Sequence, residues 1–111
     1  MDNLLTLALE AHNDEHNHHR RYEIVVGRDL LNDWTLALRY GRIGQVGQET
    51  RFASKQAAEI QSIISDRLRR RLSAPKRIGC AYRLVTLNMA SGIDANQWLP
   101  DAVMARFFHA A

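Results

Sequence analysis

The sequence predicts an α+β fold: an antiparallel sheet of four to five strands with one long amphipathic helix packed on one face, followed by a short C-terminal helix. Apolar and polar residues alternate in residues 4–11, 21–28 and 34–40, as they do in a half-buried strand. In residues 57–72 the apolar residues recur roughly every three to four positions, which is typical of an amphipathic helix. Consecutive strands on short connections favour an antiparallel meander.

The length and composition suit one domain with a modest core, since the chain has 111 residues and 46% of them are apolar. We expect residues 1–87 to form this domain and residues 88–111 to form a linker and a short helix. No apolar run reaches the length of about 18 residues that a membrane span needs. The start of the chain lacks the pattern of a secretion signal, and the single cysteine, Cys80, excludes an internal disulfide. These features indicate a cytoplasmic protein.

The first two predicted strands form a hairpin with a polar tip at residues 12–19. Their apolar faces consist of Leu5, Leu7, Leu9, Tyr22, Ile24 and Val26. The tip contains His12, His16, His18 and His19, and neutral imidazole is a common metal ligand. Their spacing matches no closed structural metal site, and cysteine partners are missing. The sequence therefore favours flexible surface histidines and predicts no metal or other cofactor.

The clearest strand, residues 34–40, places Trp34, Leu36, Leu38 and Tyr40 on one face. Two glycines in residues 44–47 predict a turn, after which residues 48–52 return as a shorter, more polar strand. Strict alternation would bury Tyr40 with Trp34. A glycine bend after Tyr40 is the alternative, since it would rotate the end of the strand.

The long helix is expected to begin at an N-cap, Ser54, and to end near Pro75, because proline disfavours helix in the residue before it. Its apolar stripe consists of Ala57, Ile60, Ile63, Ile64, Leu68 and Leu72. This stripe should cover the apolar face of the sheet, since neither surface can stay exposed alone. Lys76 and Arg77 are expected in the loop that follows.

In the C-terminal part, residues 81–87 predict a fifth strand and residues 88–96 a linker of small and polar residues. Pro100 suits the first position of a short helix. The apolar face of this helix would consist of Val103, Met104, Phe107 and Phe108. It either packs on its own domain or, through Val103, Phe107 and Phe108, contacts a second copy or another protein.

A short motif, Arg39-Tyr40-Gly41-Arg42-Ile43-Gly44, begins at the end of the clearest strand. A planar ring and a guanidinium presented together suit a base or sugar and a phosphate, because stacking and charge-assisted hydrogen bonds need those groups. The structural alternative is a tyrosine in the core and an arginine that holds the carbonyl of a turn. Both interpretations of Tyr40 and Arg42 remain open from the residues alone.

Positive charge is concentrated after this motif, where residues 54–77 carry seven basic and two acidic residues. Arg70, Lys76 and Arg77 are candidates for phosphate contacts, which release counterions from nucleic acid. The alternative for Arg70 and its neighbours is a structural one, since cations are favoured at a helix C-terminus by the helix dipole. Cys80 has no base at a motif spacing and is interpreted as a small buried thiol, so no enzyme activity is predicted.

The order of these features resembles the WGR family, which is named for a Trp-Gly-Arg triplet. Tyr40-Gly41-Arg42 stands at the position of the triplet and is followed by Ile43-Gly44. Arg21-Tyr22-Glu23-Ile24 resembles the upstream aromatic strand of the family, and Phe52-Ala53-Ser54 resembles its entry into the helix. The resemblance covers about residues 4–84, and the sequence departs from the family in having tyrosine for tryptophan at residue 40.

The resemblance implies a non-catalytic module that binds nucleic acid, with DNA ends or strand breaks as the expected target. WGR modules occur in poly(ADP-ribose) polymerases, and also alone in small bacterial proteins. The polymerases' catalytic domain is absent, so no ADP-ribose transfer is implied. Tyr40 would stack on a terminal sugar or base, and Arg42 would meet phosphate, with Arg39, Gly41, Arg70, Lys76 and Arg77 around them. The alternative is a docking module for another protein without nucleic acid.

Overall fold

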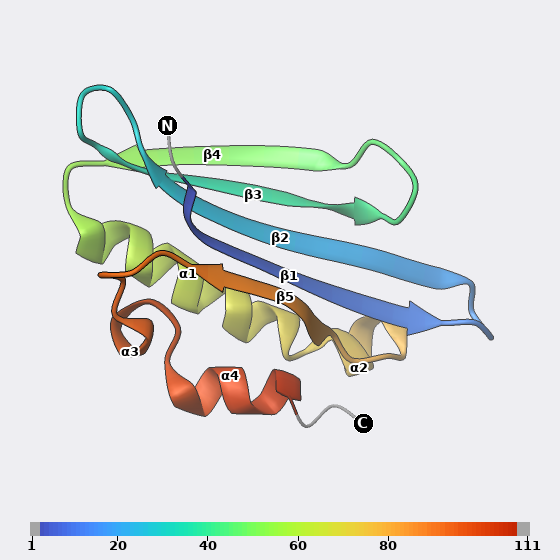
Figure 1. The fold of residues 1–111 in the computed structure, drawn as a ribbon. Helices are drawn as coiled ribbons and strands as arrows, with labels where there is room; N and C mark the ends of the chain where they lie inside the picture. The colour runs from blue at the N-terminus through green and yellow to red at the C-terminus, as the bar shows by residue number, and fades with distance from the viewer. Residues whose placement is uncertain (1–2, 109–111) are drawn as a thin grey trace.

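The computed structural model describes residues 3–108, apart from the side chain of Phe108, and has an α+β architecture (Figure 1). Its strands are β1 (Asn3–Asn13), β2 (His18–Arg28), β3 (Trp34–Arg42), β4 (Gln48–Ser54) and β5 (Arg83–Met89). Its helices are α1 (Ala57–Arg71), α2 (Ala74–Ile78), α3 (Ala95–Trp98) and α4 (Asp101–Phe108). The strands form one sheet in the order β4-β3-β2-β1-β5. The predicted fold class is confirmed.

The first four strands form the predicted meander, because the apolar residues of neighbouring strands meet across the sheet. Leu9 lies opposite Tyr22, and Tyr22 lies opposite Tyr40 on its other side. All neighbouring pairs of these strands are antiparallel. The fully buried side chains of this face include Leu5, Leu7, Leu9, Tyr22, Ile24 and Val26. The alternation in the sequence therefore predicted the core face of the sheet correctly.

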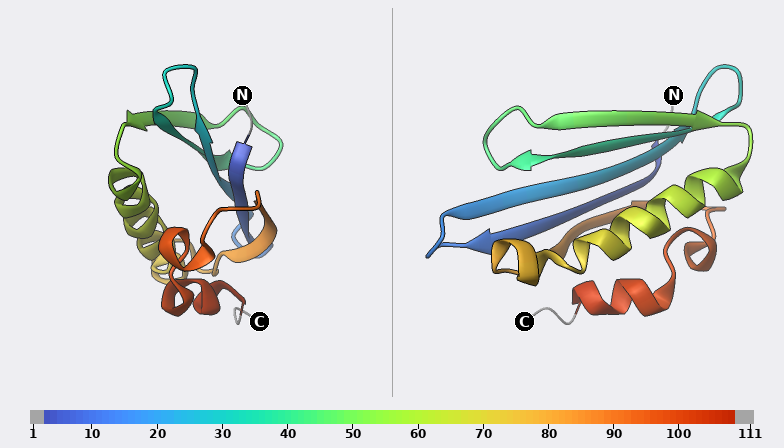
Figure 2. Two further views of the ribbon diagram at one scale, coloured as in Figure 1. Left: turned by 60° about the vertical axis from the view of Figure 1, so that its left-hand side comes forward. Right: turned by 180° about the vertical axis from the view of Figure 1, so that it is seen from behind.

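Helix α1 lies across this core face, and α3 and α4 lie beside it (Figure 2). Helix α1 buries Ile60, Ile64 and Leu68. The apolar side chains that flank them, Ala57, Ile63 and Leu72, pack against the same core. After α2 the chain returns to the sheet as β5, which pairs with β1 at the edge opposite β4. Burial of both apolar surfaces is what joins the helix to the sheet.

The start of α1 and the segment that follows it differ from the prediction. Ser54 is not the N-cap, because β4 continues to Ser54 and its hydroxyl instead accepts a hydrogen bond from the N–H of Gln56, where the cap lies. Pro75 does not lead into a loop. It lies in the first turn of α2, where a missing N–H costs no helical hydrogen bond. Lys76 and Arg77 are therefore helical, and Gly79, with a φ of 78°, ends the helix.

The C-terminal part packs on its own domain. Val103, Met104 and Phe107 are buried in the core that β1, β2, β3 and α1 also form. The rings of Trp98 and Trp34 lie 5.1 Å apart between their centroids. Of the two alternatives from the sequence, the structure shows Val103 and Phe107 packed on their own domain. The side chain of Phe108 lies outside the part that the structure describes. None of the described helices is long and apolar enough to cross a membrane.

Candidate nucleic-acid interface

The motif residues line a shallow hollow of ≈ 210 Å³ beside the turn between β3 and β4. Arg39, Tyr40, Gly41 and Arg42, which the sequence singled out, all contribute to its wall. The other residues of the wall are Arg21, Glu23, Ile43, Gly44, Gln45 and Gly47. The hollow is therefore built from the end of β3 and the turn that follows it, with β2 beside them.

Two glycines allow the turn to fold closely over the end of β3. A Cβ added at Gly41 would lie 2.9 Å from the Cα atom of Gly47, and a Cβ at Gly47 would overlap the carbonyl oxygen of Tyr40. The turn is also tied to β2, because the N–H of Ile43 donates to the carbonyl oxygen of His19 over 2.8 Å. Glycine is required here for the close approach of two backbone segments.

Gly47→Ala should therefore destabilise the protein and disturb the hollow. Because the added methyl meets backbone, the turn must move, and overpacking of this kind costs about 1–3 kcal/mol. Urea unfolding of the variant measures this cost. Gln45→Ala, in the same exposed turn, is the control and should leave the free energy of unfolding nearly unchanged. Equal stability of Gly47→Ala and the parent chain would contradict the close approach.

Tyr40 is half-buried and continues the core face of β3. Its ring centroid lies 6.0 Å from that of Tyr22, and its ring packs against the hydrophobic core. The strand keeps its alternation through Gly41, since the pairing of β2 with β3 continues to Arg20 opposite Arg42. A bend that turns the whole ring outward, one of the two alternatives from the sequence, is therefore absent at Tyr40. Only the part of the ring left accessible at the surface is available for stacking.

Arg42 is exposed at the end of β3. Its Nη1 atom donates a hydrogen bond of 2.9 Å to the carbonyl oxygen of Asn17, in the turn between β1 and β2. The structural alternative, an arginine that holds a turn carbonyl, is thus present. Within the described residues, however, no acidic side chain forms an ion pair with Arg42. Among the described residues its guanidinium forms no hydrogen bond besides the one to Asn17, so its other N–H donors remain for a ligand.

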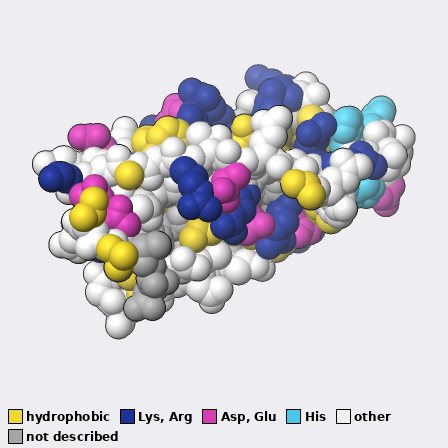
Figure 3. Space-filling model, turned by 90° about the horizontal axis from the view of Figure 1, so that it is seen from above, with side chains coloured by type: hydrophobic (Ala, Val, Ile, Leu, Met, Phe, Trp, Pro, Cys, Tyr) yellow, Lys and Arg dark blue, Asp and Glu magenta, His cyan; other side chains and the backbone are white. Residues whose placement is uncertain are grey.

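Arg39 has a different environment, on the face of the sheet that α1 does not cover. Its Nε atom donates to Oε1 of Glu49 over 2.6 Å, and Arg51 donates to Oε2 of the same carboxylate over 2.8 Å. The hydrogen bond with Glu49 raises the pKa of Arg39, and the same bond, followed by that with Arg51, lowers the pKa of Glu49. Figure 3 shows basic and acidic side chains next to each other on this side of the molecule. Arg39 therefore has an acidic partner, which it shares with Arg51.

The other predicted basic residues gather where α1 meets α2. Arg70, Arg71, Ser73 and Arg77 line a hollow of ≈ 340 Å³ there. Arg77 donates from Nε to Oγ of Ser73 over 3.0 Å and from Nη2 to the carbonyl oxygen of Arg70 over 3.2 Å. These bonds orient Arg77 at the end of α1, and Lys76 is exposed beside it. Arg70 also shares the carboxylate of Asp66 with Arg67.

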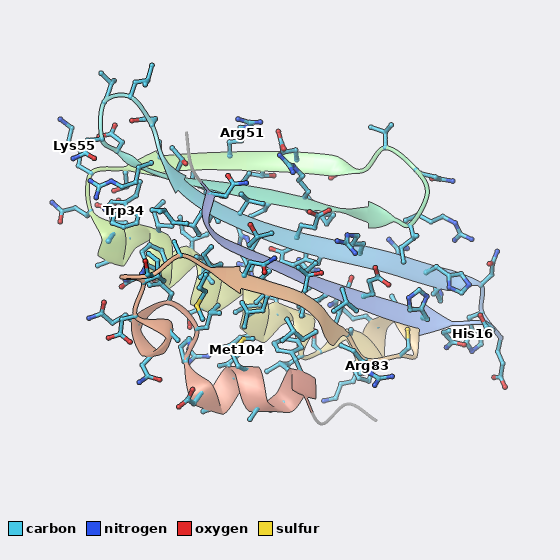
Figure 4. The ribbon with its side chains drawn as sticks, in the orientation of Figure 1. His16, Trp34, Arg51, Lys55, Arg83 and Met104 are labelled. Carbon is cyan, nitrogen blue, oxygen red and sulfur yellow. The ribbon has the colours of Figure 1, made fainter. Side chains whose placement is uncertain are left out.

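The hairpin of β1 and β2 connects the two groups. Arg42 donates to the carbonyl oxygen of Asn17 on one side of its turn, while the amide of Asn13 donates to the carbonyl oxygen of Gly79, at the end of α2, over 3.3 Å. Figure 4 places this turn, marked by His16, at the end of the molecule opposite Lys55. Arg42 and the α1–α2 corner therefore flank the same hairpin end.

Two further basic residues belong to this region, although neither was among the predicted site residues. The guanidinium of Arg71 lies over the ring of Tyr22, with its Cζ atom 4.3 Å from the ring centroid. Since Tyr22 packs beside Tyr40, Arg71 links the corner to the motif. Arg20 is exposed opposite Arg42 in the sheet. The predicted strand began at Arg21 and so left Arg20 out. A strand that began earlier would have placed Arg20 on the same face as Tyr22, two residues away.

The structure gives little support to a reactive cysteine or a large metal centre. Cys80 is half-buried against the core, and burial raises the pKa of its thiol, which disfavours the thiolate that nucleophilic chemistry needs. Among the described residues, no three His, Cys, Asp or Glu side chains converge closely enough to hold a metal ion together.

The comparisons with known proteins identify the family. The model of the WGR domain matches residues 5–72, which is more than half of the chain and extends from β1 to the end of α1. The match includes the motif hollow and excludes α2, β5, α3 and α4. A search of curated proteins finds no significant match. On the strength of the family match, this chain belongs to the WGR domain family.

Proposed function

We propose that this chain is a non-catalytic module that binds nucleic acid, with DNA ends or strand breaks as its target by family resemblance. The observation that carries the proposal is the set of exposed cations around the hairpin end. Arg20, Arg42, Lys76 and Arg77 are exposed there, and none forms an ion pair within the described residues. Uncompensated cations spread over a surface suit a ligand with repeated phosphates.

The half-buried Tyr40 supports a limited stacking role. A nucleobase or sugar can contact an accessible part of the ring, while the packing of the ring against the core keeps its position well defined. Arg39 is a weaker candidate for phosphate contact, because binding there would compete with its bond to Glu49. The proposal therefore assigns the main phosphate contacts to Arg42, Lys76 and Arg77, and gives Arg70, which pairs with Asp66, a secondary contact for the same reason as Arg39.

Mobility shifts with blunt, nicked, closed circular and single-stranded DNA, each at two salt concentrations, test the proposal. We expect binding to weaken steeply as salt rises, because each phosphate contact releases counterions. Tighter binding to blunt and nicked DNA than to closed circles would support ends or breaks as the target. Binding that is unaffected by salt, or no binding to any of the four DNAs, would contradict the proposal.

A protein-docking function is the second candidate, and one observation favours it. Leu30 and Leu31, between β2 and β3, are 95% and 82% exposed. The carboxylate of Asp29 accepts hydrogen bonds from the N–H groups of Leu31 and Asp33, which holds this loop in one shape. Exposed apolar side chains on a fixed loop suit a protein partner. The double variant Leu30→Ser, Leu31→Ser should then lose a protein complex and keep DNA binding unchanged.

A further inference from the structure

Two histidines from neighbouring strands face each other beside the motif. His12 in β1 lies opposite His19 in β2, and their Nδ1 atoms are 2.9 Å apart. The strands extend further than the sequence predicted, so these residues belong to the sheet and only residues 14–17 form the turn. His12 and His19 are therefore held in register by backbone pairing, unlike the flexible surface histidines that the sequence favoured.

The second nitrogen of each ring faces a carboxylate. Nε2 of His12 lies 3.0 Å from Oε1 of Glu10, and Nε2 of His19 lies 3.5 Å from Oδ1 of Asp14. Histidines that ligate a metal commonly donate their other ring N–H to a carboxylate, which fixes the tautomer and makes the ligating nitrogen more basic. The two Nδ1 atoms face each other, so an ion that replaces the hydrogen bond between them would have both as ligand atoms.

From this geometry we propose that His12 and His19 form an open, two-imidazole site for a divalent transition-metal ion. With metal–imidazole bonds of about 2.0 Å, two ligands at a right angle lie about 2.8 Å apart, close to the observed separation of the Nδ1 atoms. A right angle is the geometry of tetragonal Cu²⁺. Cu²⁺ should therefore bind more tightly than Zn²⁺, while Mg²⁺ and Ca²⁺, which prefer oxygen ligands, should not bind.

The remaining positions around the ion would be open to water or another ligand, since the two side chains are 51% and 30% exposed. The site would also join β1 to β2 where the carbonyl oxygen of His19 accepts the hydrogen bond from Ile43 of the motif. A bound ion would hold this end of the sheet together and raise the stability of the folded chain, because the unfolded chain does not keep the two rings adjacent.

Electron paramagnetic resonance of the chain with Cu²⁺ alone tests the proposal. The spectrum should show two imidazole nitrogens on the ion, and one or none in His12→Gln and in His19→Gln. The control variant, His16→Gln with His18→Gln, removes two nearby histidines whose rings are 6.3 Å apart and should keep the two-nitrogen spectrum. Thermal unfolding should show a Cu²⁺-dependent rise in Tm for the parent chain and this control, but not for the other two variants.

A loss of the two-nitrogen spectrum in the control variant would overturn the proposal, since it would indicate a loose cluster of histidines at the turn. So would a spectrum that His12→Gln and His19→Gln leave unchanged. If both variants fail to fold, ¹⁵N resonances of the parent chain during a Zn²⁺ titration decide the question. Shifts at Nδ1 of His12 and His19 support the site. Unchanged resonances leave only a hydrogen bond between the two rings and contradict it.

Discussion

Replacing Arg42 with alanine should weaken the binding of duplex DNA about ten- to a hundredfold. A hydrogen bond to a charged group is worth about 1.5–3 kcal/mol, and about 1.4 kcal/mol corresponds to a factor of ten in affinity. Arg42 is exposed and has no acidic partner among the described residues, so it can bind phosphate without first breaking an ion pair. Titrations at several salt concentrations measure the change, and the slope of affinity against salt should fall by about one phosphate contact.

Lys55→Ala is the matched control for Arg42→Ala. It removes one exposed positive charge from the opposite end of the molecule, so it should change the affinity for DNA only slightly (Figure 4). Arg42→Lys keeps the charge but loses the planar guanidinium that can bind phosphate through two hydrogen bonds. Its affinity for DNA should lie between those of Arg42→Ala and Lys55→Ala. Equal losses in Arg42→Ala and Lys55→Ala would show that binding depends on total charge and would contradict the proposed interface.

Replacing Phe107 with alanine should destabilise the protein by about 3–5 kcal/mol, the usual cost of removing a large buried aromatic side chain. Phe107 is 2% exposed and packs in the same core as β1 and α1. For a domain of this size Tm should fall by at least about 10 °C, which thermal unfolding followed by circular dichroism measures. The C-terminal helix would then contribute to the stability of the whole domain.

Leu30→Ala is the control for Phe107→Ala, because it also removes a large apolar side chain, but from a position that is 95% exposed. Its effect should stay within about 0.5 kcal/mol. A similarly small effect of Phe107→Ala would contradict the packing of α4 on the core. It would favour instead the predicted division into a domain at residues 1–87 and a separate C-terminal segment.

Much of the fold could be predicted from local patterns in the sequence. The alternation of Leu5, Leu7 and Leu9 identified the buried face of β1, and the helical spacing of Ile60, Ile64 and Leu68 identified the buried face of α1. Both patterns are reliable because a side chain's face depends only on its position within its own strand or helix. The motif at the end of β3 was found for a similar reason, since its residues are consecutive.

The arrangement of the candidate site depended on contacts between residues that are distant in the sequence. Arg42 meets the carbonyl oxygen of Asn17, 25 positions away, and Asn13 meets that of Gly79, 66 positions away. These contacts bring the motif and the α1–α2 corner to one hairpin end. The compensation of Arg39 by Glu49 likewise follows from the register of β3 and β4.

The sequence by itself determined the fold class, the strands of the meander, the long helix and the position of the motif, residues 39–44, at the end of β3. Only the tertiary structure decided that Tyr40 packs beside Tyr22, that Arg42 stays free of acidic partners while Arg39 does not, and that His12 faces His19. The physical reason is that periodic patterns report which face of an element is apolar. The partner of a polar side chain depends on sheet register and on where the chain returns, which no local pattern records.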